Sequence, residues 1–361
     1  MNALEVQLRA MIAEEGPMSV ERYMGLALAH PQFGYYMSQN AIGAAGDFIT
    51  APEISQMFGE LIGLWAAQTW HLLGEPQPLR LVELGPGKGT MMSDVLRSAR
   101  ISQQFFSSLD VHLVETSPRL MQAQQATLAG SALPVQWHRS VTDVPPGPMI
   151  VLANEFFDAL PVRHYVRRDG AWRECCVMVG EDDRLIFAVA PTVEAAITNM
   201  ASEGEMLEIG AAGYQFMSAL AARLAAQGGA ALIIDYGHTV TGFGETLQAL
   251  KGHQYVNPLA DPGECDLTTH VDFAALARAA RAQGLIVHGP VTQGAFLREI
   301  GIESRAQALA KRANERQQGQ LSAALARLTE GGKGMGELFK VMAVAVPGVA
   351  ALPGFSNGAL S

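Results

Sequence analysis

The residues with the clearest chemical potential lie in a glycine-rich loop, within the stretch LVELGPGKGTMM at 81–92. Gly85, Gly87 and Gly89 have the spacing GxGxG, after an apolar run and before a helical pattern that begins at Thr90. Glycine lets a loop turn sharply and lets a ligand approach the backbone. The start of the following helix offers free N–H groups and a positive dipole end to an anion. This context predicts a binding site for a nucleotide-like ligand.

An acidic residue before the loop narrows the class of ligand. Dinucleotide sites use GxGxxG and bring a pyrophosphate to the helix, whereas Glu83, two residues before Gly85, would repel a phosphate group. A carboxylate at this position suits the α-ammonium of a methionine moiety, directly or through water, while the methionine carboxylate meets the helix start near Thr90. The stretch therefore favours S-adenosylmethionine (SAM) over NAD. A tight strand-to-helix turn without a ligand is the alternative.

Two further strand ends extend this site. Glu115 ends the second strand, where a carboxylate can accept both ribose hydroxyls of an adenosine, in SAM and NAD alike. A solvated acid at a strand end is the other interpretation. Ser140 follows the third strand together with His138 and Arg139, so we expect this segment near the adenine.

The fourth strand runs into NEFFDALPV at 154–162 and supplies the residues for the reaction itself. Polar residues at the carboxyl end of a sheet strand face the ligand crevice. We expect Asn154 to contact the cofactor. Methyl transfer requires a positioned nucleophile and, where necessary, a proton acceptor. Glu155 is the first choice for that acceptor and Asp158 the second, although Asp158 capping a turn is the structural alternative.

The order of strands and helices predicts an α/β fold. Expected strands alternate with helices and form a doubly wound, Rossmann-like parallel sheet, with strands at Leu79–Leu84, Val111–Val114, Val135–His138 and Met149–Ala153. Short strands after Pro161 predict an antiparallel β insertion, and other helices add a lobe. Residues 239–270 are expected to be mostly loop. The expected regions are a helical and loop region at 1–78, a core at 79–161 and 230–346 with a helical insertion at about 293–330, an insertion at 162–229 and a tail at 347–361.

Composition excludes several classes of protein. The chain has 361 residues, 49% of them hydrophobic, and a formal net charge of −10, which argues against a nucleic-acid partner. No uninterrupted apolar run reaches the ~18 residues of a membrane span. The first residues resemble neither a secretion signal nor a transit peptide, so we expect a cytoplasmic protein. No CxxC pair occurs, and we expect no metal site.

A series of motifs in order resembles the MidA-like methyltransferases, a group that includes the mitochondrial protein arginine methyltransferase acting in respiratory complex I assembly. The motifs are HPQFGYY (30–36), GDFITAPEISQMFGE (46–60), VELGPGKGT (82–90), LVETSP (113–118), NEFFDALPV (154–162), IDYGH (234–238), GETLQALKGH (244–253), DLTTHVDF (266–273) and MGELFK (335–340). The resemblance covers nearly the whole chain. It implies a Rossmann-like SAM-dependent methyltransferase and a protein substrate, an arginine of a respiratory complex I subunit, in a bacterial relative of the mitochondrial enzyme.

The resemblance also draws attention to residues beyond the stretches discussed above. We expect five of them in the substrate cleft: Asp47, Thr50, Glu53, Asp235 and Tyr236. Charge matching at a helix start is the alternative for Glu53. His270 is a candidate proton acceptor, but a helix cap and a structural hydrogen bond among Asp266, His270 and Asp272 is the simpler interpretation.

Three other functions remain open at this point. A SAM-dependent methyltransferase could act on a small molecule, and a closed apolar pocket would favour that substrate. A non-catalytic assembly factor could bind SAM for stability alone, and would tolerate replacement of Glu155. A nicotinamide oxidoreductase would require another ligand at the glycine loop and would bind NADH. The sequence leaves the oligomeric state and the methylation pattern undetermined.

Overall fold

The computed structural model describes residues 1–38, 50–349 and 351–356. The chain forms two compact units, which we describe separately. The first unit comprises Met1–Phe48, Phe157–Gln215 and Val240–Asp272, and the second comprises Ile49–Phe156, Phe216–Thr239 and Phe273–Ser361. Within the described ranges, no helix combines the length and the apolar character needed to cross a membrane.

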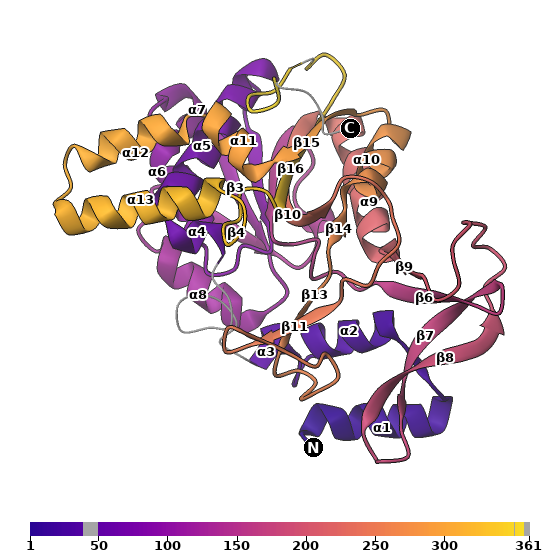
Figure 1. The fold of residues 1–361 in the computed structure, drawn as a ribbon. Coiled ribbons are helices and arrows are strands. Elements are labelled where there is room, and N and C mark those ends of the chain that lie inside the picture. The colour runs from indigo at the N-terminus through magenta and orange to yellow at the C-terminus, as the bar shows by residue number, and fades with distance from the viewer. Residues whose placement is uncertain (39–49, 350, 357–361) are drawn as a thin grey trace. The chain divides into compact units, whose positions relative to one another are not determined.

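The second unit is built on a mostly parallel sheet (Figure 1). In spatial order its strands are β15 (Ile286–Thr292), β16 (Phe339–Ala345), β10 (Gly229–His238), β5 (Met149–Asn154), β2 (Leu79–Leu84), β3 (Leu109–Val114) and β4 (Val135–His138). The strands from β10 to β4 pair in parallel, and β16 runs antiparallel to both of its neighbours. This confirms the expected Rossmann-like sheet.

The central strands are apolar because helices cover both faces of the sheet (Figure 1). All six residues of β5 are buried, without the alternation of a sheet that has one face in water. Ile150 and Leu152 pack in the same core as Trp65 of α5 (Gln56–Leu72), while Val151, between them in sequence, points to the opposite face.

The helices of the second unit are α4 (Ala51–Ile54), α5 (Gln56–Leu72), α6 (Thr90–Ala99), α7 (Gln103–Ser108), α8 (Pro118–Leu128), α9 (Ala211–Gln227, from Phe216 on), α10 (Phe273–Ala282), α11 (Gln293–Glu299), α12 (Ile302–Ala310) and α13 (Glu315–Thr329).

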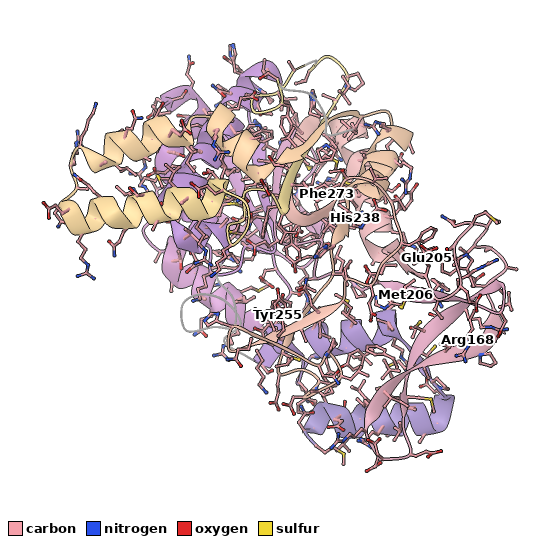
Figure 2. All side chains as sticks on the ribbon, viewed as in Figure 1. Arg168, Glu205, Met206, His238, Tyr255 and Phe273 are labelled. Carbon is pink, nitrogen blue, oxygen red and sulfur yellow. The ribbon has the colours of Figure 1, made fainter. Side chains whose placement is uncertain are left out.

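The first unit combines short helices with two antiparallel sheets. Its helices are α1 (Ala3–Glu15), α2 (Val20–Ala29) and α3 (Tyr35–Ser38), and its strands are β1 (Met18–Ser19), β6 (Arg163–Arg168), β7 (Ala171–Val179), β8 (Leu185–Val193), β9 (Met206–Ile209), β11 (Gln248–Lys251), β12 (Gln254–Val256), β13 (Asp266–Thr268) and β14 (Val271–Asp272). Strand β6 ends at Arg168, and β9 begins at Met206 (Figure 2). Leu8, Tyr23 and Leu267 share one apolar core.

Several segments differ from the sequence-based expectation. The region 239–270 is more than loop, because β11 pairs with both β12 and β13. The helical insertion predicted at about 293–330 consists of three helices, α11, α12 and α13. It breaks at Gly301, whose φ of 99° lies in the left-handed region, and again at Asn314, which caps α13 together with Gln317. The left-handed glycine ends the first helix, and the side-chain cap at Asn314 starts the third.

Candidate functional site

The topology of the second unit places the candidate site at the carboxyl ends of β2 and β5. Strand β2 pairs with β3 on one side and with β5 on the other, so the strand order reverses there. In doubly wound sheets, ligands bind outside the carboxyl ends of the strands at this reversal. The glycine loop follows β2 and the NEFF segment follows β5, which brings the two most informative stretches of the sequence to one edge of the sheet.

The three glycines adopt backbone conformations that other residues rarely take. Gly85, Gly87 and Gly89 have φ values of 57°, 53° and 81°. A Cβ atom at Gly85 would lie 3.1 Å from Cδ2 of Phe156, so the absent side chain lets the loop pack against the segment after β5. Gly89 is the N-cap of α6, without a side chain to cap the helix. The loop therefore leaves the helix start to another partner.

Glu83 has the properties of a group that binds a cationic ligand. The side chain is only 2% exposed, and its Oε2 atom has no hydrogen-bond partner among the described residues. Burial raises the pKa of the Glu83 carboxyl well above its usual range. An unsatisfied buried carboxylate oxygen is costly, and the ammonium of a methionine moiety would satisfy it. These residues thus fit SAM.

Glu115 is buried directly after β3 and is held by several donors. Its Oε1 accepts the backbone N–H groups of Thr116 and Ser117, each at 2.8 Å. Its Oε2 accepts Nε2 of Gln124 at 3.1 Å. Burial raises the pKa of Glu115, and the Ser117 N–H opposes that rise. The carboxylate is fixed in one orientation, as recognition of a diol requires.

Thr90 and Glu53 join the glycine loop to α4. The Thr90 hydroxyl donates to Oε1 of Glu53, so Glu53 contacts the first residue of α6. Thr50 is the N-cap residue of α4, and its carbonyl accepts the Glu53 N–H at 3.0 Å. Asp47, the other residue expected in this segment, lies outside the described residues. Helix α4 therefore reaches the cofactor loop through a charged side chain.

Asn154 and Glu155 end β5 beside this loop. Oε1 of Glu155 accepts the Ala51 N–H at 3.2 Å and Nδ2 of Asn154 at 3.0 Å. Glu155 has a φ of 51°, which is uncommon for a residue with a side chain and costs about 1–3 kcal/mol. Asn154 is buried, and its Oδ1 has no hydrogen-bond partner among the described residues. The Glu155 carboxylate is thus held in place although its backbone conformation is unfavourable.

Asp235 supports the same turn from β10. Its side chain is fully buried, and its two carboxylate oxygens accept the backbone N–H groups of Phe156 at 3.2 Å and Tyr236 at 2.9 Å. These contacts hold the residue that follows Glu155. The ring of Tyr236 is half-buried and packs on Phe339, with ring centroids 5.3 Å apart. A contact of either residue with substrate stays a prediction.

Other predicted residues have different surroundings. Ser140 lies after β4 and caps the turn Val141–Asp143, accepting the Thr142 N–H at 3.2 Å. Asp158 and His270 belong to the first unit, where the Thr269 N–H donates to the Asp158 carbonyl at 3.0 Å. The His270 N–H donates to Oγ1 of Thr246 at 2.8 Å. The described ranges contain no cluster of three or more His, Cys, Asp or Glu side chains that could hold a metal ion.

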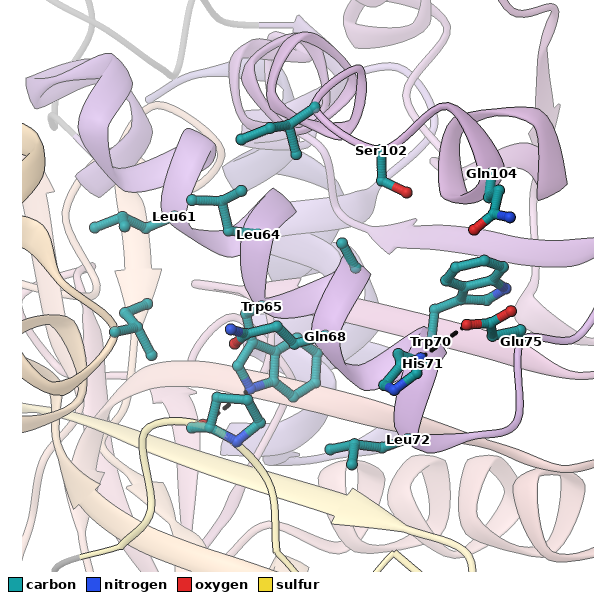
Figure 3. A pocket seen from close by; sticks show the side chains of 14 residues that line it. Leu61, Leu64, Trp65, Gln68, Trp70, His71, Leu72, Glu75, Ser102 and Gln104 are labelled. Carbon is teal, nitrogen blue, oxygen red and sulfur yellow. Dashed lines mark hydrogen bonds and ion pairs between the residues drawn. The ribbon is translucent and has the colours of Figure 1, made fainter.

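A separate cavity of about 740 Å³ lies along α5 (Figure 3). Leu61, Trp65 and Trp70 line it, and His71 pairs with Glu75 at its rim, with 2.8 Å between Nδ1 and Oε1. None of the predicted site residues lines this cavity. It belongs to the outer surface of the helical layer rather than to the strand ends.

Gln124, which the sequence analysis passed over, contacts two parts of the site, the Gly87 carbonyl and the Glu115 carboxylate. It is one of three glutamines in the stretch QAQQ at 122–125, and only Gln124 is fully buried. A signal does exist in the sequence, because Leu120, Gln124 and Leu128 follow the i, i+4, i+8 spacing of one helix face. An amide on an otherwise apolar helix face indicates that a polar group lies opposite it in the interior and forms hydrogen bonds with it.

Comparison with known proteins agrees with this geometry. The family described as "Putative S-adenosyl-L-methionine-dependent methyltransferase" matches residues 61–291, which is more than half of the chain. The chain belongs to this methyltransferase family. The protein arginine methyltransferase NDUFAF7 of Danio rerio is 40% identical over 328 residues, 84% of this chain and 77% of the relative. The Drosophila melanogaster homologue is 39% identical over 383 residues, 97% of this chain and 86% of the relative.

A solved structure supports the same cofactor. The methyltransferase is similar, with a TM-score of 0.87 and 28% identity, to a Burkholderia thailandensis protein bound to S-adenosyl-homocysteine. The match covers 99% of this chain and 95% of that one. S-adenosyl-homocysteine is SAM after loss of its methyl group. The family and this neighbour together show a SAM-dependent methyltransferase, and the expected MidA-like resemblance is confirmed.

Proposed function

We propose that the methyltransferase transfers a methyl group from SAM to an arginine of a protein substrate. The observation that carries this proposal is Glu155, a carboxylate held at the carboxyl end of β5 by Ala51 and Asn154, on a backbone with positive φ. A carboxylate binds a guanidinium through charge-assisted hydrogen bonds and can take its proton as the nitrogen reacts. The relatives named protein arginine methyltransferase support the same acceptor.

The roles of the other residues follow from their positions. Glu83 binds the ammonium of the methionine moiety, and Thr90 at the start of α6 orders the helix end that receives the methionine carboxylate. Glu115 accepts the ribose hydroxyls, and Asn154 orients both Glu155 and the cofactor. Glu53, Thr50 and Tyr236 border the acceptor. Asp158 and His270, which belong to the first unit, remain alternative candidates for the proton acceptor. SAM supplies the activated methyl group when it is bound.

The substrate class can be tested by mass spectrometry. Cells that lack the methyltransferase and cells that carry it are compared for methylated arginine, with deuterated methionine as the source of the methyl group. We expect the label on arginine in few proteins, and the resemblance noted above proposes a respiratory complex I subunit. A label on a small metabolite, with protein arginine unlabelled, would favour the small-molecule alternative. If the purified protein binds SAM, but neither protein arginine nor a small metabolite acquires the label in cells, the assembly factor would be favoured.

The pKa of Glu83 leads to a prediction about pH. Because burial raises this pKa, the free protein holds a proton on Glu83 at pH values at which an exposed glutamate is ionised. A bound ammonium favours the carboxylate, so binding of SAM expels that proton. We expect the affinity for SAM to rise with pH, by up to about tenfold per pH unit below the raised pKa, and to level off above it.

Calorimetric titration with SAM, in two buffers of different ionisation enthalpy, measures this proton release. The apparent binding enthalpy of the unaltered protein should depend on the buffer at low pH. Glu83→Gln serves as the control, since it cannot release a proton and should give weaker, buffer-independent binding. Equal enthalpies in both buffers for the unaltered protein would contradict the assigned role of Glu83.

A further inference from the structure

Gln124 of α8 forms a hydrogen-bonded link between two parts of the cofactor site. Its Nε2 donates to the Gly87 carbonyl at 2.9 Å and to Oε2 of Glu115 at 3.1 Å. Its Oε1 accepts Nε1–H of Trp137 at 2.9 Å. The side chain is fully buried, so no water competes for these bonds.

The partners fix the orientation of the amide without ambiguity. An indole N–H can only donate, so the amide oxygen faces Trp137. A backbone carbonyl can only accept, so the amide nitrogen faces Gly87. Both nitrogen hydrogens are then used, one on the glycine loop and one on the carboxylate that follows β3. Glutamine is the side chain of this length that supplies two donors and one acceptor in this arrangement.

The backbone of α8 is built around this link. A Cβ atom at Gly89 would lie 3.4 Å from Cα of Gln124, so the glycine loop packs directly on α8 at this residue. Ser117 caps the helix and accepts the Leu120 N–H at 3.3 Å, while its own N–H donates to Glu115. The helix therefore contacts Glu115 at its start and the glycine loop at Gln124.

We propose that Gln124 is a positioning residue for the cofactor: it fixes the Gly87 carbonyl and the Glu115 carboxylate relative to each other before the cofactor binds. The proposal rests on the roles assigned above to Gly87 and Glu115. Trp137 on β4 is the anchor that keeps the amide in its orientation. A preorganised site spends less of its binding energy on ordering its own groups. Loss of the link therefore weakens SAM binding more than it slows methyl transfer from bound SAM.

The decisive variant is Gln124→Glu, which keeps the shape of the side chain and removes both donors. The new carboxylate would face the Gly87 carbonyl and the Glu115 carboxylate, and both contacts would become repulsive. Gln125→Glu is the matched control, because it adds the same charge to the same helix at an exposed position. Calorimetric titration with SAM and with S-adenosylhomocysteine gives Kd, and steady-state kinetics gives KM and kcat.

We expect Gln124→Glu to weaken the binding of both ligands by about 30-fold or more, within the range for unpaired buried polar groups. The KM for SAM should rise while kcat changes by less than about threefold, and Gln125→Glu should behave as the unaltered protein. Should Gln124→Glu fail to fold, Gln124→Met keeps the volume without any polar atom and answers the same question. Trp137→Phe removes only the anchor and should have an intermediate effect.

The outcomes separate this inference from the proposed cofactor site. Normal SAM binding by folded Gln124→Glu and Gln124→Met, with Gly87→Val unable to bind, would overturn the role of Gln124 and leave the loop in place. Normal binding by Gly87→Val would overturn the assignment of the loop itself. Lower thermal stability with unchanged Kd would reduce Gln124 to a structural residue and would also overturn the proposal.

Discussion

Glu155→Gln is expected to lower kcat for methyl transfer by about 10²–10⁴-fold, the usual contribution of a positioned proton acceptor. The amide oxygen of the new residue can still accept the Ala51 N–H, and the left-handed backbone at this position is unchanged by the substitution. The turn should therefore keep its shape. The Kd for SAM should change by less than about threefold, which calorimetry measures directly alongside the rate.

Glu75→Gln is the matched control for this prediction. Glu75 is also a glutamate with positive φ, at 58°, but it follows α5 and pairs with the exposed His71. Its replacement should leave kcat unaltered. If Glu155→Gln retained normal turnover with the unaltered acceptor, Glu155 would lose its assigned role, and Asp158 and His270 would be the next candidates for the proton acceptor.

Gly87→Val is expected to abolish measurable SAM binding. At a φ of 53° a β-branched side chain is strained, and its methyl groups would occupy the space through which a ligand approaches the loop backbone. A loss of about 100-fold or more in affinity would place binding beyond the usual calorimetric range. Methyl transfer at ordinary SAM concentrations should disappear with it.

Backbone strain alone must be separated from a blocked site. Gly332 has a φ of 68°, and a Cβ atom there would meet no atom within 4 Å, so Gly332→Val imposes a similar conformational cost outside the glycine loop. It should lower the melting temperature without changing the Kd for SAM. Tight binding of SAM by folded Gly87→Val would show that the ligand lies elsewhere.

Much of the fold could be predicted because the central strands are apolar runs between strong turn signals. The predicted strands at Leu79–Leu84 and Val135–His138 have the bounds found in the structure. The strands within 239–270 were missed because they are only three or four residues long and carry little alternation, so their pairing with one another defines them. Strands that are defined by such pairing show no alternation of apolar and polar residues from which they could be predicted.

The candidate site was predictable to the extent that chemistry follows strand ends. The glycine loop, Glu83, Glu115 and Glu155 all lie where β2, β3 and β5 end. The spacing of Leu120, Gln124 and Leu128 marks a buried amide, but the sequence could not foresee that its partners are the Gly87 carbonyl and the Trp137 indole. It also could not foresee that the Asp235 carboxylate faces backbone N–H groups of its own unit.

The position of β16 has a consequence for how the protein is made. Among the described residues this strand comes after all the others in sequence, yet it lies between β10 and β15 and pairs with both. A ribosome that has not yet released residues 339–345 leaves β10 and β15 with unpaired edges, and such edges recruit other strands. The nascent chain must therefore keep a gap open inside its own sheet until residues 339–345 have left the ribosome. A chaperone that shields hydrophobic strands during translation would protect the molecule in that interval.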